Sequence, residues 1–185
     1  MRGAGGWVSG YVVPVTSGEL DGTITIGKER VDLGGGTGYH DHNWGFWEGV
    51  RWQWGQVQGE DLSFVYGRVF PPADAADAIR VPGFLMAIGS EGVIGYATDV
   101  SIQESDGVST AGPPRRIVIT GQSDSLRLTL DIATDQVTTS RMPQGAFGGG
   151  MDFLQMRGSY HVSGRVGDRK VEFTAHGSAE TFRGR

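Results

Sequence analysis

Two histidines and an aspartate stand side by side in a stretch of the chain that is crowded with tryptophan. Residues 39–54 read YHDHNWGFWEGVRWQW, and they hold two of the four histidines and four of the five tryptophans of this 185-residue chain. Imidazole and carboxyl groups are the common acids, bases and metal ligands of proteins, whereas indoles make apolar walls. Three kinds of site therefore compete here: an acid–base pocket, a metal centre, and a crowded piece of core.

The acid–base hypothesis centres on Asp41. A carboxyl group that is desolvated by indole rings has a raised pKa and stays protonated closer to neutral pH. We predict Asp41 as a proton donor, with His40 and His42 tuning it or handling water. Because electron-rich ring faces stabilise developing positive charge, such a site suits the protonation of an alkene, followed by hydration, cyclisation or isomerisation.

The alternation of a β-strand constrains this hypothesis. If the chain is extended here, His40 and His42 share one face with Trp44, and Asp41 points to the other face. Only an irregular backbone would bring both histidines and the aspartate into one pocket. The preceding run GGGTG, residues 34–38, permits such an irregularity because glycine adopts positive φ.

A metal centre is the third hypothesis. Two histidines at i, i+2 of a strand can reach one metal ion, as in cupin barrels, and His161 or His176 could add a third imidazole. Glu48 follows His42 at a wider spacing than in cupins, and the second cupin motif is missing. We therefore predict no metal and no other cofactor.

The aromatic residues around this stretch are predicted to line a ligand cavity. The indoles would shape the cavity, and a tyrosine and an arginine on the following strand would orient a polar end of the ligand. Plain packing of the barrel bottom is the competing account for Trp52 and Trp54. The predicted substrate contacts are Tyr39, Trp44, Trp52, Trp54, Tyr66 and Arg68.

The rest of the chain indicates an all-β fold. Glycine makes up 32 of the 185 residues, and these glycines separate short apolar runs, as in a barrel or sandwich with many tight turns. Residues 126–132 alternate strictly between apolar and polar types, and residues 58–61 and 121–124 are typical of hairpin turns. We predict one antiparallel lipocalin-like β-barrel over residues 1–185, of about ten strands, with little helix. The weak helix candidate is residues 73–79, and residues 71–80 and 142–150 are predicted loops.

Composition excludes several classes of protein. The formal net charge is −5, with no concentrated basic patch, so we predict no nucleic-acid partner. The absence of cysteine excludes disulfides and thiol chemistry. Residues 1–10 contain no long apolar segment, so neither a signal peptide nor a membrane span is expected, and the cytoplasm is the default location.

The Trp-rich stretch also carries a resemblance. GTGYHDHNWG at residues 36–45 and WQWG at residues 52–55 resemble the carotenoid 1,2-hydratase (hydroxyneurosporene synthase) and AttH-like family. YVVP at residues 11–14 and GSAETFR at residues 177–183 look like the second barrel domain of that family. The resemblance implies a lipocalin-like barrel for a hydrophobic ligand, related in fold to tocopherol cyclase and to fungal lipocalin-type Diels–Alderases. Members of the family carry two such barrels, whereas this chain has room for one.

The first functional hypothesis is accordingly a barrel enzyme, a hydratase, cyclase or isomerase that acts on an isoprenoid- or polyketide-like alkene. A non-catalytic carrier of an apolar ligand is the alternative from another class. A homodimer, or a partner barrel supplied by another chain, is compatible with either hypothesis.

Overall fold

Thirteen β-strands make up the regular structure of the part of the chain that the structure describes. The structure is a computed structural model that describes residues 6, 8–45, 50–71, 75, 83–106, 112–142 and 150–184. Across these residues there is no helix of the length and apolar character needed to cross a membrane. In chain order the strands are β1 (Ser9–Leu20), β2 (Thr23–Ile26), β3 (Glu29–Asp32), β4 (Gly36–Gly45), β5 (Arg51–Gln58), β6 (Ser63–Phe70), β7 (Phe84–Gly89), β8 (Gly92–Ala97), β9 (Asp99–Asp106), β10 (Pro114–Gln122), β11 (Leu126–Met142), β12 (Met151–Val166) and β13 (Arg169–Gly184).

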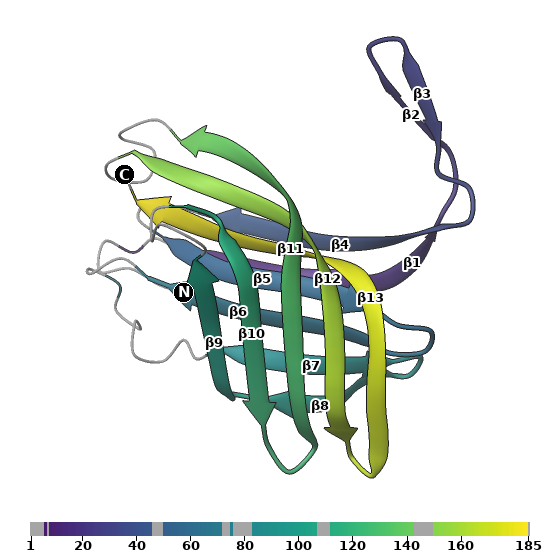
Figure 1. The fold of residues 1–185 in the computed structure, drawn as a ribbon, viewed down its shortest axis with the longest axis vertical. Coiled ribbons are helices and arrows are strands. Elements are labelled where there is room, and N and C mark those ends of the chain that lie inside the picture. The colour runs from purple at the N-terminus through teal and green to yellow at the C-terminus, as the bar shows by residue number, and fades with distance from the viewer. Residues whose placement is uncertain are drawn as a thin grey trace.

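Nine of these strands form one antiparallel sheet that curls into a nearly closed barrel. The strand order is β8-β7-β6-β5-β13-β12-β11-β10-β9, and the long strands β10–β13 cross β5–β8 steeply (Figure 1). The two halves join where β13 pairs with β5, from Gly177–Val57 to Glu180–Trp54. The predicted all-β barrel fold is therefore confirmed.

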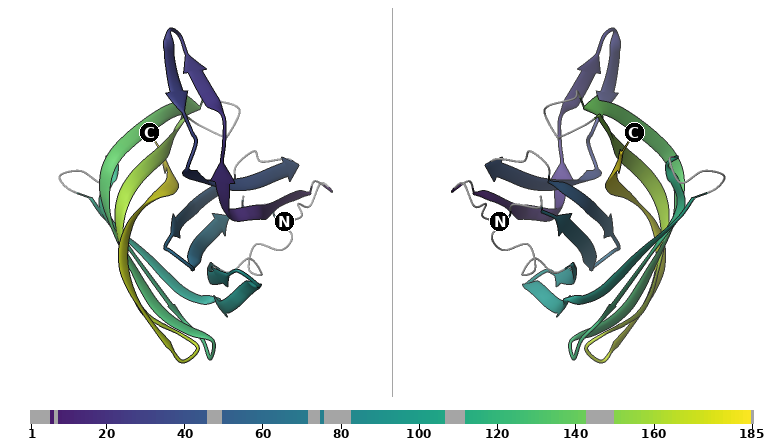
Figure 2. Two further views of the ribbon diagram at one scale, coloured as in Figure 1. Left: turned by 90° about the vertical axis from the view of Figure 1, so that its right-hand side faces the viewer. Right: turned by 90° about the vertical axis from the view of Figure 1, so that its left-hand side faces the viewer.

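A separate ribbon of two strands lies outside the barrel. β1 and β4 pair antiparallel, from Ser9–Gly45 to Leu20–Gly36, and the hairpin β2–β3 projects from the far end of this ribbon (Figures 1 and 2). Gln58 fastens the ribbon to the barrel, because its side-chain amide donates to the carbonyl oxygens of Thr16 (3.0 Å) and Gly38 (3.2 Å). The ribbon thereby gives part of the barrel wall a second, buried face.

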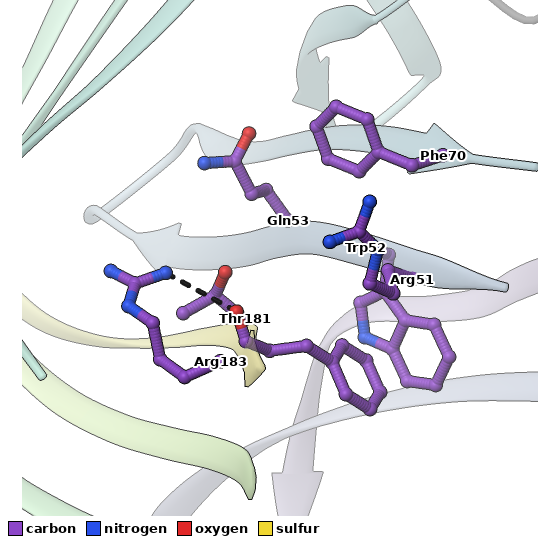
Figure 3. Close-up of a pocket in the computed structure, with 7 residues that line it drawn as sticks. Arg51, Trp52, Gln53, Phe70, Thr181 and Arg183 are labelled. Atoms are coloured by element: carbon purple, nitrogen blue, oxygen red, sulfur yellow. Dashed lines mark hydrogen bonds between the residues drawn. The ribbon is translucent and has the colours of Figure 1, made fainter. Parts of the chain in front are cut away.

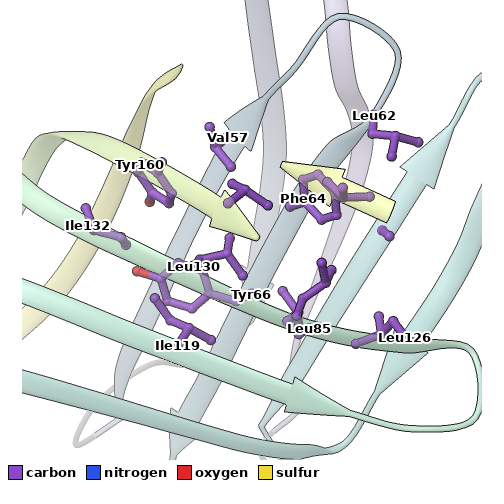
Figure 4. Packing of buried hydrophobic residues seen from close by; sticks show 14 of the residues in the cluster. Val57, Leu62, Phe64, Tyr66, Leu85, Ile119, Leu126, Leu130, Ile132 and Tyr160 are labelled. Atoms are coloured by element: carbon purple, nitrogen blue, oxygen red, sulfur yellow. The ribbon is translucent and has the colours of Figure 1, made fainter. Parts of the chain in front are cut away.

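Strand alternation fills the barrel with apolar side chains. Leu126, Leu128, Leu130 and Ile132 are all buried in the lumen, as their alternation predicts. They meet side chains from the opposite wall, among them Tyr66, in one continuous cluster (Figure 4). The lumen is thus a packed core over most of its length.

Two tyrosines supply the polar atoms of this core. Tyr66 and Tyr160 are 1% and 0% exposed, and the Tyr160 hydroxyl donates to the Ser178 carbonyl oxygen at 2.5 Å. Burial raises the pKa of both phenols, so both remain protonated hydrogen-bond donors at physiological pH.

Both faces of β5 are buried, each against a different partner. Val57 points into the lumen, where the Tyr66 ring lies over Gly55. Trp54 points outward, into a second cluster with Val65 and Phe84 that lies beneath the ribbon. The strand that carries two of the predicted site residues therefore separates the core from the ribbon interface.

The sequence prediction differs from the structure in strand number and length. About ten strands were expected, and thirteen are present among the described residues. One reason is that residues 36–45, whose extension the sequence left open, form β4. β11 continues to Met142 because its second half pairs with β12 in full register, from Gln136–Arg157 onward. Val137, Thr138 and Thr139 are exposed there, so no apolar alternation marks this part of the strand. The predicted helix at 73–79 and the loops at 71–80 and 142–150 fall mostly outside the described residues.

The close approach of Tyr66 to Gly55 gives a test of the barrel packing. A Cβ atom at Gly55 would lie 2.4 Å from the Tyr66 ring, so Gly55→Ala should lower the free energy of unfolding by about 1–3 kcal/mol through overpacking. Gly89 in β7 is the matched control, because its nearest neighbour would be 3.6 Å from a new Cβ atom. Urea denaturation of both variants should show a loss only for Gly55→Ala, and equal stabilities would contradict this packing.

Candidate functional site

Strand β4 sorts the predicted catalytic residues onto two faces. Its regular alternation turns Tyr39 and Asp41 toward the barrel, where both are partly buried, and leaves His40 and His42 exposed on the other side. The His42 ring stacks on Trp44, with centroids 6.1 Å apart and planes at 20°. The structure therefore separates the two imidazoles from the Asp41 carboxyl. His40 and His42 do not lie where they could tune Asp41 or handle water beside it, the roles that the sequence predicted for them.

A short chain of hydrogen bonds fixes Asp41. The Trp54 indole N–H donates to the Tyr39 hydroxyl at 2.9 Å, and this hydroxyl donates to Asp41 Oδ2 at 3.1 Å. Burial raises the pKa of Tyr39, and the charge of Asp41 adds to the rise. Tyr39 therefore stays protonated and orients the carboxyl group of Asp41.

A second carboxyl group, that of Glu180, joins the site from β13. Glu180 is in register with Trp54, and its Oε2 accepts a hydrogen bond from the Trp52 indole N–H at 3.2 Å. Burial raises the pKa of Glu180, the bond from Trp52 opposes this, and the nearby Asp41 raises the pKa further. The site thus contains two interacting carboxyl groups, one of which holds its proton more tightly than an ordinary glutamate.

Sequence reasoning did not select Glu180 as a site residue. Glu180 lies 139 positions after Asp41, and only the GSAETFR motif at residues 177–183 drew attention to its neighbourhood. The alternation of that motif was the available signal. Ala179 is buried in the lumen, so Glu180 must face outward, toward the ribbon.

The two carboxyl groups share one small pocket beneath the ribbon. Its volume is about 20 Å³, which is enough for one water molecule. Asp41 faces the same pocket as Trp52 and Trp54, as the acid–base hypothesis requires. The pocket lies on the outer face of the barrel wall, not in the lumen, and its lining residues are Tyr11, Asp41, Asn43, Trp52, Trp54, Val69 and Glu180.

A larger, open cavity lies next to this pocket. It has a volume of about 190 Å³ and occupies the place where β5 and β13 move apart (Figure 3). The Trp52 side chain lines both spaces. A ligand in the larger cavity would therefore contact the same indole that donates to Glu180. The lining residues are Arg51, Trp52, Gln53, Phe70, Thr181, Phe182 and Arg183.

The remaining predicted contacts lie apart from the pocket. Tyr66 is in the lumen core. Arg68 is exposed, with its guanidinium 5.8 Å from the centre of the Phe70 ring. Trp44 lies over Gly10 on the outer side of the ribbon. The structure thus brings Tyr39, Trp52 and Trp54 together around Asp41.

Two other features of the molecule do not form a site. A depression of about 540 Å³ borders the β5–β6 turn and β13, but its charged groups pair with one another, as in Arg169–Asp61 (2.8 Å) and Lys170–Glu172 (2.7 Å). In the part of the chain that the structure describes, no three His, Asp or Glu side chains gather closely enough to hold a metal ion. Glu48, a residue of the metal hypothesis, lies outside that part, as do Trp7 and Trp47.

Comparison with known proteins identifies a shared fold. No model of a known protein family matches the chain, and no curated protein sequence matches it. Among solved structures, the crystal structure of CghA with Sch210972 matches with a TM-score of 0.59 at 14% identity. The match covers 95% of this chain but only 55% of CghA, so this chain corresponds to about half of that protein. At this identity the likeness extends to the fold alone.

The raised pKa of Glu180 predicts a dependence of stability on pH. The folded state holds the Glu180 proton more tightly than the unfolded state does. The protonated side chain therefore stabilises the fold below its ordinary pKa of 4.5, and this stabilisation is lost as pH rises through the higher pKa of the folded state. Glu180→Gln does not lose stability in this way, because glutamine does not titrate. The free energy of unfolding of Glu180→Gln should therefore rise relative to that of the wild type from about pH 4 to about pH 8.

Asp131→Asn is the control for this measurement. The hydrogen bond from Arg116 lowers the pKa of Asp131, so the wild-type residue stabilises the fold above its ordinary pKa and loses that contribution as pH falls. The difference in free energy of unfolding between Asp131→Asn and the wild type should therefore stay nearly constant from about pH 5 to pH 8, and it should shrink only as pH falls through the ordinary pKa of 3.8. If the free energies of unfolding of Glu180→Gln and the wild type change in parallel with pH, the raised pKa of Glu180 would be contradicted.

Proposed function

We propose that this chain binds an apolar, alkene-bearing small molecule against Trp52 and protonates it from the carboxyl pair Glu180–Asp41. The observation that carries the proposal is that a half-buried Glu180, whose pKa is raised, lies beside Asp41 in a pocket walled by Trp52 and Trp54. The barrel fold shared with CghA, whose crystal structure was determined with Sch210972, supports the general class. The chemistry is inferred from the site.

The division of labour follows from the environments of the two carboxyl groups. Glu180 is the proton donor, because desolvation and the neighbouring charge both favour its neutral form. Asp41 is held by Tyr39, and its negative charge raises the pKa of Glu180. This modifies the sequence prediction, in which Asp41 itself was the donor.

The reaction would proceed through a cation that the indole faces stabilise. A C–H bond forms between the Glu180 proton and one alkene carbon, and the positive charge develops on the other carbon beside Trp52. In hydration, a water molecule adds to the cation and returns a proton to the carboxyl pair. In isomerisation or cyclisation, the cation loses a neighbouring proton to the same pair. Each route restores the protein and consumes no cofactor.

The proposal includes the substrate class that the sequence resemblance implies. An isoprenoid- or polyketide-like alkene fits a site of this kind, and membership in the carotenoid 1,2-hydratase and AttH-like family is part of the proposal. The cavity of about 190 Å³ accommodates one segment of such a molecule, since a cavity of about 150 Å³ is known to hold benzene. The reacting double bond would lie at the end of that segment beside Trp52, and the indole of Trp52 would have to move for Glu180 to reach it.

A carrier without catalysis is the second candidate. The small volume of the carboxyl pocket, about 20 Å³, favours it, because a ligand in the larger cavity touches Trp52 without reaching Glu180 unless the indole moves. In a carrier the two carboxyl groups would only anchor the ribbon.

Deuterium incorporation separates the two candidates. Apolar alkenes of the isoprenoid and polyketide types are incubated with the protein in D₂O, and mass spectrometry detects new C–D bonds. Glu180→Gln keeps the size of the side chain and should lower incorporation about a hundredfold or more, the usual effect of losing a general acid. Asp41→Asn should lower incorporation less, because Glu180 keeps its carboxyl group and loses only the neighbouring charge.

His42→Gln is the matched control variant, since its ring lies on the opposite face of the same strand. It should retain incorporation close to that of the wild type, whereas a hundredfold loss would restore the histidine to the mechanism. Should an alkene bind without any wild-type incorporation, the carrier account holds and the enzyme proposal is wrong.

A further inference from the structure

The larger cavity arises from an interruption in the barrel wall. Pairing between β13 and β5 ends at Glu180–Trp54, and the next three residues of each strand line the cavity. Both strands keep their other partners there: β5 pairs with β6 up to Arg51–Phe70, and β13 pairs with β12 through Arg183–Asp152. The gap is therefore held open by regular sheet on both sides.

Positive charge is in excess around this gap. Arg183 and the side-chain amide of Gln53 both donate to Glu104, the latter at 2.7 Å, so both oxygens of Glu104 are engaged. Arg51 is exposed and forms no ion pair with any residue that the structure describes. The cavity therefore presents a guanidinium group whose charge Glu104 does not neutralise.

The other walls of the gap are aromatic. Trp52 and Phe182 meet edge to face, with ring centroids 4.5 Å apart, and Phe70 closes the side that faces Arg51. Aromatic rings and guanidinium groups that line the same gap suit a ligand with an apolar body and a planar anionic end. A carboxylate matches the fork of N–H donors that arginine presents.

We propose that the gap between β5 and β13 binds the carboxylate of a small amphiphilic molecule, with Arg51 as its principal charged contact and the Trp52 and Phe182 rings against its apolar body. The carboxylate site itself does not depend on the proposed function. Only the identification of this molecule with the substrate or its product rests on that function. The assigned class of ligand is an aryl or short-chain carboxylic acid, or the acid end of a longer lipid.

Phenylacetate and its neutral isostere phenylacetamide test this site without any turnover. Their Kd values are measured by quenching of tryptophan fluorescence at low ionic strength, since Trp52 lines the cavity. The wild type should bind phenylacetate about tenfold more tightly than phenylacetamide, as expected for a charge-assisted hydrogen bond. Arg51→Gln should abolish most of this preference and leave phenylacetamide binding unchanged.

Two further variants make the test specific. Arg30→Gln, on the projecting β3, removes the same charge far from the gap and should retain the preference. Glu104→Gln keeps an acceptor for Gln53 but releases the charge of Arg183, so it should strengthen phenylacetate binding severalfold. Equal Kd values for the two probes in the wild type, or equal effects of Arg51→Gln and Arg30→Gln, would overturn the proposal.

The outcome is independent of the catalytic proposal. If deuterium incorporation is absent but the preference for phenylacetate depends on Arg51, the carboxylate site is supported and the enzyme proposal is wrong. If incorporation depends on Glu180 but phenylacetate and phenylacetamide bind alike, the enzyme proposal is supported and the carboxylate site is wrong.

Discussion

The indole of Trp54 holds the β1–β4 ribbon against the outside of the barrel, and the site depends on this contact. Its N–H donates to Tyr39 of the ribbon, and its ring meets Tyr11 edge-on at 4.9 Å and Phe84 at 5.2 Å. A buried indole needs both a partner for its N–H and an apolar surface for its rings. The ribbon satisfies both needs, and in doing so it carries Asp41 to a fixed place above β5 and β13.

The same placement accounts for the electrostatics. The ribbon excludes water from the outer face of the wall, so Glu180 loses solvation where it meets the charge of Asp41. Burial makes the charged form of a carboxyl group costly, so Glu180 holds its proton more tightly here than in water. Beyond Trp54 and Glu180 the two strands are no longer paired, which opens the wall to a ligand beside the carboxyl pair. Ribbon docking, proton affinity and ligand access are thus consequences of one local arrangement.

Much of this arrangement follows from strand alternation, and the rest depends on long-range pairing. The lumen face of β11 and the opposed faces of Asp41 and His42 are both predicted by a period of two, and the structure has both. Alternation does not reveal which face of β5 meets the lumen, because both of its faces are buried. Nor does it bring Glu180 to Asp41, since that contact requires the register between β13 and β5 and the ribbon above them. The local pattern therefore indicates orientation, and the tertiary fold determines which residues meet.

The proton affinity of Glu180 is the central claim, and an NMR titration of its side-chain carboxyl carbon measures it directly. In the wild type the pKa should lie above the ordinary glutamate value of 4.5, because of burial and the charge of Asp41. In Asp41→Asn it should move down toward that value but remain raised, since desolvation persists while the neighbouring charge is gone. A Glu180 that titrates at 4.5 in the wild type, and does not respond to Asp41→Asn, would contradict the account.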